Sequence, residues 1–163
     1  METMITTDFT TTFVVNQTPE EVFNAVTNVR GWWSEEIEGS TNKLNGEFKY
    51  HYEDVHRCKM KIIEFLPNER VVWLVLDNYF KFTNDKSEWN GNKIIFEITR
   101  TGNNTQLRFT QLGLIPDYEC YTICRDAWTN YIQNSLRSLV ITGKGQPNGK
   151  DKPQTENEKR LAK

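Results

Sequence analysis

The apolar residues of this chain change their spacing once, and that change constrains the fold more than any other feature. From Phe9 to Val15, and in stretches between 46 and 112, apolar residues alternate with polar ones, as in strands. From 121 to 139 they follow steps of three and four, which is typical of an amphipathic helix. Strands followed by one long helix predict an α+β domain whose sheet packs against that helix.

Capping and turn residues predict where the elements begin and end. Thr18-Pro19-Glu20-Glu21 has the form of a capping box, so a helix is expected from about 19 to 28, with a second short helix or turn around 29–36. Gly102-Asn103-Asn104 predicts a hairpin, and Gly143 is expected to end the long helix. The strands expected from the pattern lie at 9–15, 46–52, 58–62, 70–76, 93–100 and 105–112.

Short connections between these strands predict an antiparallel sheet of six strands. Because one helix covers only one face of such a sheet, the sheet should curl around the helix and leave an apolar cavity between them. The domain is expected to span 1–142. Residues 143–163 are polar and charged, so we expect a disordered tail there.

Composition excludes several classes of protein. The chain has 20 Lys and Arg against 22 Asp and Glu, and its tail is basic, so the domain itself is acidic and a nucleic-acid partner is not expected. No run approaches the ~20 apolar residues of a membrane span. The N-terminus lacks a signal-peptide pattern, and 3 cysteines without framework spacing indicate reduced thiols. These features predict a cytoplasmic protein.

Four local motifs carry a resemblance to a known family. They are T-P-E-E-V-F at 18–23, G-W-W at 31–33, I-E-F-L-P-N-E-R-V-V-W at 63–73, and Ala127-Trp128 with Leu136, Leu139 and Gly143. In this order they resemble the helix-grip superfamily (START-like, Bet v 1-like, SRPBCC), and within it the C-terminal domain of the activator of Hsp90 ATPase. The resemblance covers about 6–142. Ala127 stands where the family commonly has Gly, and 79–92 matches no family pattern.

The resemblance implies a cavity that binds a small hydrophobic or aromatic molecule without catalysis. Inward-facing side chains expected to contact such a ligand are Trp33, Phe48, Tyr50, Met60, Trp73, Phe96, Phe109, Tyr121 and Trp128. Phe80, Phe82 and Trp89 lie in the long stretch 78–92, which is either an aromatic lid or an irregular strand. Arg125 is a candidate anchor for an anionic ligand head. The alternative is that the aromatics simply fill the core.

Residues for catalysis or metal binding are sparse. His51 is expected to face solvent and His56 to lie in a turn, and with Glu53 and Asp54 they fit no zinc pattern, so neither a metal nor a cofactor is expected. Cys124 falls on the buried stripe of the long helix and is expected to act as a small hydrophobe. A polyketide cyclase or dehydratase-like enzyme is an alternative that needs a buried acid–base pair.

Aliphatic residues also occupy the outer face of the predicted sheet. Val72, Leu74 and Leu76 point away from the predicted core, and Ile63 and Ile95 are expected to join them. A solvent-facing sheet surface does not normally carry so many branched aliphatics. This pattern predicts a homodimer, or coverage by the long loop. A protein-interaction module similar to the Hsp90 co-chaperone domain, with a chaperone as partner, is a further alternative.

Overall fold

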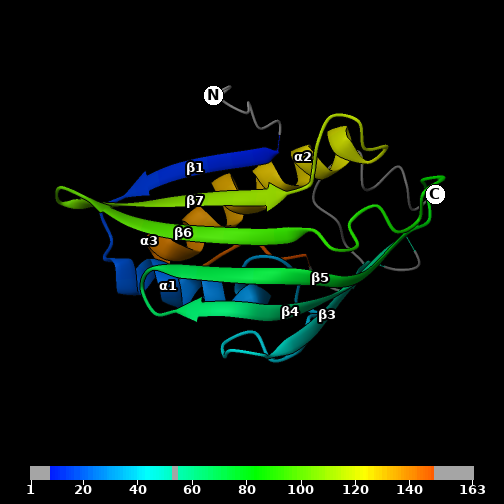
Figure 1. Cartoon of the computed structure of the whole chain (residues 1–163). Coiled ribbons are helices and arrows are strands. Elements are labelled where there is room, and N and C mark those ends of the chain that lie inside the picture. Colours follow the sequence, from blue (N-terminus) through cyan, green and yellow to red (C-terminus); the bar gives the residue numbers. More distant parts are fainter. Residues whose placement is uncertain (1–7, 53–54, 149–163) are drawn as a thin grey trace, which may run out of the picture.

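Seven antiparallel strands form one sheet in the computed structural model, which describes residues 8–52 and 55–148 (Figure 1). The strands are β1 (Phe9–Val15), β2 (Glu38–Gly39), β3 (Glu47–Tyr52), β4 (His56–Leu66), β5 (Arg70–Phe80), β6 (Lys93–Thr101) and β7 (Asn104–Leu112). Their order across the sheet is β1-β7-β6-β5-β4-β3-β2. The prediction of six strands was wrong because β2 has only two residues, too few to show an alternating pattern.

Helices cover the concave face of this sheet (Figure 1). They are α1 (Pro19–Thr27), the 3₁₀ turn η1 (Val29–Gly31), α2 (Tyr121–Thr129), the π-helical η2 (Asn130–Leu136) and α3 (Arg137–Thr142). The capping box of α1 is confirmed, since the backbone N–H of Glu21 donates to Thr18 Oγ1 and that of Thr18 donates to Glu21 Oε1, each at 3.1 Å. The second short helix is a single 3₁₀ turn.

The long C-terminal helix runs without interruption from α2 through η2 into α3. Its middle seven residues wind as a π-helix, which the regular steps of three and four did not predict. Such π segments are rare and are often found at functional sites. Gly143 ends the helix as expected, at φ +83°, with its N–H donating to the carbonyl of Leu139.

Strands β4 and β5 are 11 residues long and make the sheet curl. Their pairing shifts register between Lys59 and Met60 and again between Ile62 and Glu64. Such bulges bend a strand and increase its twist. The far ends of β3, β4 and β5 therefore curve away from the rest of the sheet (Figure 1).

Tryptophans fill the centre of the interior. Trp32, Trp33, Trp73 and Trp128 are all buried, and the rings of Trp33 and Trp73 stack with centroids 6.0 Å apart and planes 9° apart. The ring centroids of Trp33 and Trp128 are 5.0 Å apart, so Trp33 links Trp73 on β5 to Trp128 on α2. We call these four side chains the tryptophan core.

Residues after the long helix return to the body of the domain. The side-chain amide of Asn148 is buried and donates to Tyr131 Oη at 2.6 Å, while its backbone N–H donates to the carbonyl of Trp33. The backbone N–H of Gln146 donates to Ser135 Oγ. The part of the predicted tail from 149 to 163 lies outside the described residues.

Candidate ligand pocket between the sheet and the C-terminal helix

An apolar pocket of about 30 Å³ lies where the curled ends of β3, β4 and β5 approach α2. Its lining consists of Trp33, Tyr50, Tyr52, Val55, His56, Phe80, Phe82, Trp89, Ile123, Cys124, Ala127, Trp128 and Tyr131. Small-molecule sites usually measure roughly 300–1,000 Å³, so in this conformation the pocket has room for a few water molecules at most. Aromatic side chains therefore fill most of the interior that the sequence predicted as a cavity.

The secondary structure brings this lining together from six segments, of which the turn after η1 supplies Trp33. Alternation on β3 turns Tyr50 and Tyr52 inward, and the same alternation places His56 on β4 and Phe80 at the end of β5. On the helix, the lining residues from 123 to 131 recur at intervals of three and four, so they share one face. Residues 81–92, which we call the closing segment, supply Phe82 and Trp89.

His56 is a pocket residue, and the prediction that it lies in a turn is wrong. It is the first residue of β4 and pairs with Phe80 across the sheet. Its ring centroid lies 4.4 Å from that of Phe80, in a tilted contact, and 4.9 Å from that of Trp89, in an edge-to-face contact. Burial lowers its pKa to about 4, although a hydrogen bond between its Nε2 and Asn78 Oδ1 opposes the shift. His56 is therefore an uncharged imidazole at neutral pH.

Two indole N–H groups of the interior lack a hydrogen-bond partner among the described residues. They belong to Trp73 and Trp89, and only Trp89 lines the pocket. By contrast, Trp128 Nε1 donates to Gln111 Oε1 at 2.8 Å and Trp32 Nε1 donates to the carbonyl of Val26. An unsatisfied buried donor costs about 1–3 kcal/mol, so it marks a place where the native packing is not optimised for stability alone.

Two glutamates attach the closing segment to the start of α2. The Glu88 carboxylate accepts hydrogen bonds from the backbone N–H groups of Glu119 (2.6 Å) and Cys120 (3.1 Å). The Glu119 carboxylate accepts from those of Asn84 and Asp85, each at 2.9 Å, and these bonds lower its pKa. We call this reciprocal pair the glutamate clasp. It lies at the surface, whereas Phe82 and Trp89 of the same segment reach the pocket.

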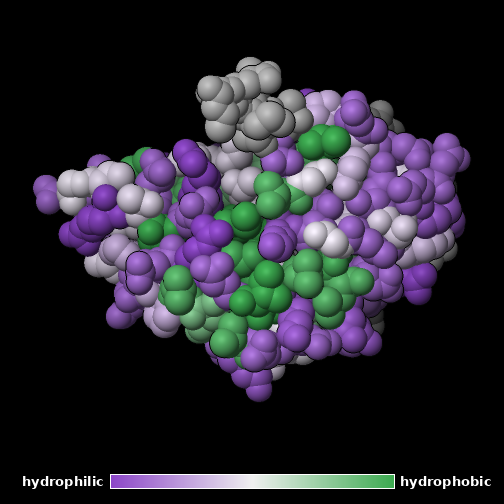
Figure 2. Space-filling view, viewed as in Figure 1, coloured by the Kyte–Doolittle hydropathy of each residue, from purple (hydrophilic) through white to green (hydrophobic). Residues whose placement is uncertain are grey.

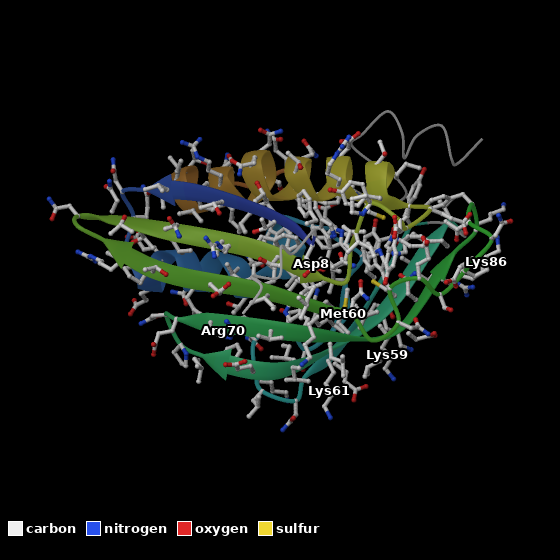
Figure 3. The ribbon with its side chains drawn as sticks, turned by 45° about the horizontal axis from the view of Figure 1, so that its top comes forward. Asp8, Lys59, Met60, Lys61, Arg70 and Lys86 are labelled. Carbon is white, nitrogen blue, oxygen red and sulfur yellow. The ribbon has the colours of Figure 1, made fainter. Side chains whose placement is uncertain are left out.

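The stretch 78–92 was predicted to be either an aromatic lid or an irregular strand, and its structure changes after Phe80. Residues up to Phe80 continue β5, and the closing segment consists of turns and bends. Lys86 lies at its outer tip and is exposed (Figure 3). A lid role for the closing segment remains a prediction.

The pocket brings together six of the thirteen residues predicted to contact a ligand. These six are Trp33, Tyr50, Phe80, Phe82, Trp89 and Trp128. Five others are buried in the core outside the pocket lining, namely Phe48, Met60, Trp73, Phe96 and Phe109. Tyr121 and Arg125 do not line the pocket. Arg125 instead pairs with Asp126 at 3.1 Å, with its guanidinium 5.8 Å from the Tyr121 ring.

The opposite face of the same strands carries charge. Met60 is fully buried, while its neighbours Lys59 and Lys61 extend from the other face of β4 (Figure 3). An open groove of about 440 Å³ on this face is lined by residues of both charge signs, among them Lys49, Arg57 and Asp77. His51 also borders this groove and lies 3.6 Å from Glu36.

Catalytic and metal-binding groups are few in the described part of the chain. No group of three or more His, Cys, Asp or Glu side chains within residues 8–52 and 55–148 is arranged to hold a metal ion. Among the described residues that line the pocket, none carries a carboxylate that could pair with His56. Burial, with a smaller effect of Asp77, raises the pKa of the Cys58 thiol, which keeps it protonated. No helix in the described residues is long and apolar enough to cross a membrane.

A sheet curled around a long C-terminal helix, with an apolar pocket between them, defines the helix-grip class of α+β domains. The family described as "Activator of Hsp90 ATPase homolog 1-like protein" matches residues 16–140, and the chain belongs to this family. The resemblance stated from the four sequence motifs is therefore confirmed. A comparison with curated proteins gave no match.

Solved structures share this fold. The Aha1 dimer from Colwellia psychrerythraea, determined in solution, superposes with a TM-score of 0.69 at 22% identity, covering 87% of this chain and 100% of that one. DynU16, a putative protein in the dynemicin biosynthetic locus, gives 0.64 at 14% identity over 86% of this chain and 49% of its own. CalU16 from Micromonospora echinospora superposes with a TM-score of 0.61 at 12% identity, covering 95% of this chain and 81% of its own. At these identities the likeness establishes the fold.

Proposed function

We propose that this protein binds a small aromatic molecule in the pocket between β3–β5 and α2, without catalysing a reaction. The observation that carries this proposal is the pocket wall itself, which is almost entirely aromatic and aliphatic and is shared between the rigid sheet, the helix and the closing segment. Flat rings pack well against such walls, through both buried area and ring–ring contacts.

Binding requires the pocket to enlarge, because about 30 Å³ does not admit an aromatic ring. The closing segment is the part that can move at the lowest cost. Its outer attachments are the surface carboxylates of the glutamate clasp, and within the segment only Trp89 belongs to the continuous core that the sheet and the helix share, with Phe82 packed against it. Apolar ligand area buried after opening contributes about 25 cal/mol per Å², which must exceed the costs of opening and association.

An NMR titration of the full chain with naphthalene tests this proposal. We expect the amide signals of Tyr52, Trp89 and Cys124 to shift with saturation. Native mass spectrometry of freshly purified protein is expected to retain a bound small molecule as well. An absence of shifts up to the solubility limit of naphthalene, together with a ligand-free mass, would contradict the proposal.

A variant that fills the pocket locates the site. Ala127 lines the pocket from α2, so Ala127→Val should weaken naphthalene binding by about tenfold, the effect of overpacking a confined site. Thr129 lies on the exposed side of the same helix, which makes Thr129→Val the matched control. Equal binding by both variants would place the ligand elsewhere.

The second candidate is self-association through the outer face of the sheet. Apolar side chains gather on this face, which Figure 2 shows toward the viewer. Among them, Leu76 is 39% exposed, Leu74 and Ile95 are half-buried, and Val72 is buried beside the Arg70–Glu64 and Arg70–Glu97 ion pairs. We call Val72, Leu74, Leu76 and Ile95 the outer patch. The solution structure from Colwellia psychrerythraea is a dimer, which supports a homodimer here.

Light scattering over a range of protein concentrations tests this candidate. A dimeric mass that persists on dilution is expected if the outer patch joins two copies of the chain. A monomeric mass at high concentration would contradict it and favour a different partner, such as a chaperone.

A further inference from the structure

Two nitrogen-bearing rings, the imidazole of His56 and the indole of Trp89, meet at one wall of the aromatic pocket. His56 on β4 and Trp89 on the closing segment both line it, and their ring centroids are 4.9 Å apart with the planes at 87°. Asn78, buried on β5, holds the far side of the imidazole through its Oδ1, which lies 2.9 Å from His56 Nε2.

The Asn78 contact determines which nitrogen of His56 carries the proton. An amide oxygen can only accept a hydrogen bond, so the Nε2 that faces it must be the protonated nitrogen of the neutral ring. The lone pair then remains on Nδ1, which is an acceptor. Burial keeps the imidazole neutral, with a pKa of about 4, so this arrangement holds throughout the physiological pH range.

Trp89 provides the complementary donor. Its Nε1–H is buried and has no hydrogen-bond partner among the described residues, although the indole itself lies in the pocket wall. The pocket wall therefore places one donor and one acceptor on two rings in edge-to-face contact, among side chains that are mostly aromatic or aliphatic. A single hydroxyl group can satisfy both, because it accepts one hydrogen bond and donates another.

We propose that the pocket selects uncharged aromatic molecules that carry a ring hydroxyl, which accepts from Trp89 Nε1–H and donates to His56 Nδ1. This inference rests on the proposed function, since it names the class of ligand that the same pocket takes. A carboxylate on the ring is disfavoured, because no cationic side chain is present in the described lining and a buried charge without a partner is costly.

Four related probes separate the contributions of shape, donor and acceptor in the wild-type chain. Naphthalene has neither polar group, 2-methoxynaphthalene can only accept, 2-naphthol can accept and donate, and 2-naphthoate is charged. By isothermal titration calorimetry at pH 7, we expect 2-naphthol to bind about tenfold more tightly than naphthalene, with 2-methoxynaphthalene between them and 2-naphthoate weakest.

A pair of tryptophan variants isolates the indole N–H. Trp89→Phe keeps an aromatic ring but removes the donor, so the preference for 2-naphthol over naphthalene should fall by about fivefold while naphthalene affinity changes little. Trp73→Phe is the matched control, because Trp73 has an equally buried, unpartnered Nε1–H outside the pocket lining. This control should preserve the preference.

The outcomes distinguish this inference from the proposed function. If none of the four probes binds, binding in the pocket itself fails. If naphthalene and 2-naphthol bind equally, the pocket binds aromatic molecules but hydroxyl recognition is overturned. Tighter binding of 2-naphthoate, or an unchanged preference in Trp89→Phe, would also overturn hydroxyl recognition, whereas equal affinities for 2-methoxynaphthalene and 2-naphthol would remove His56 as the acceptor.

Discussion

The tryptophan core and the neighbouring pocket are built from the same kinds of side chain but differ in how completely they are packed. In the tryptophan core the rings pack against one another, and of its four members Trp33 and Trp128 also line the pocket. In the pocket, Trp89 has a buried N–H without a partner among the described residues, His56 packs against its ring, and a turn-rich segment closes the wall.

This difference shows that an inward-facing aromatic residue is not by itself evidence of a ligand site. Trp73 and Phe96 point inward as the sequence predicted, but both are fully buried in the core. The pocket instead lies where the bulged strands β4 and β5 curve away from the rest of the sheet and approach α2, with the closing segment completing its wall. Strand curvature, more than aromatic content, determines the position of the candidate site.

The largest expected effect comes from deleting a ring of the tryptophan core. Trp73→Ala should lower the free energy of unfolding by about 3–5 kcal/mol, because the surrounding rings cannot collapse into the space. Phe82 lines the pocket and is half-buried, so Phe82→Ala should lower the free energy of unfolding by only about 1–2 kcal/mol. Urea denaturation measures both. Equal losses of unfolding free energy in the two variants would mean that the tryptophan core and the pocket are packed equally well.

A smaller effect is expected from acidification at the pocket end. The pKa of His56 is about 4 in the folded state, below its ordinary value of 6.5, so the unfolded chain takes up the proton first as pH falls. The stability contribution of neutral His56 is therefore complete above pH 6.5 and is lost progressively toward pH 4, by up to about 3 kcal/mol.

The control for this pH effect is His56→Phe, which keeps a ring but cannot titrate. Chemical denaturation between pH 7 and 4 should show a shallower loss of stability in the variant, since carboxylate protonation is common to both proteins. Parallel pH profiles would contradict the burial of a neutral imidazole.

The glutamate clasp is expected to act locally. Glu88→Ala removes the acceptor for two backbone N–H groups, so amide hydrogen exchange in 81–92 should become about tenfold faster with little change in the melting temperature. Glu97→Ala, which removes a carboxylate from the outer face, is the matched control. Unchanged exchange in Glu88→Ala would show that the remaining contacts of the segment, among them the Glu119 hydrogen bonds and the buried Trp89, hold it closed without Glu88.

The smallest expected effect on stability is at the outer patch. Leu76→Lys should change the free energy of unfolding by no more than about 0.5 kcal/mol, because the side chain is already 39% exposed. The same change should dissociate a dimer formed through the patch. Leu66→Lys, at an equally exposed position at the end of β4, should leave the mass by light scattering unchanged.

The sequence was informative wherever a local signal existed. The capping box at Thr18, the hairpin at Gly102 and the stop at Gly143 are all confirmed, because each depends on a few neighbouring residues. The two-residue strand β2 and the π-helical turns escaped prediction, since neither leaves a repeating pattern. His56 was missed because its neighbours on both sides, Tyr52 on β3 and Phe80 on β5, are known only once the strands are paired.

By itself, the sequence determined the class of the domain, the inward faces of the strands and helix, and the family, because periodicity and capping are local properties of the chain. The tertiary structure alone decided that most inward aromatics fill the core and that six of the predicted residues converge with His56. These outcomes depend on strand curvature and on contacts between distant segments, which no local pattern encodes.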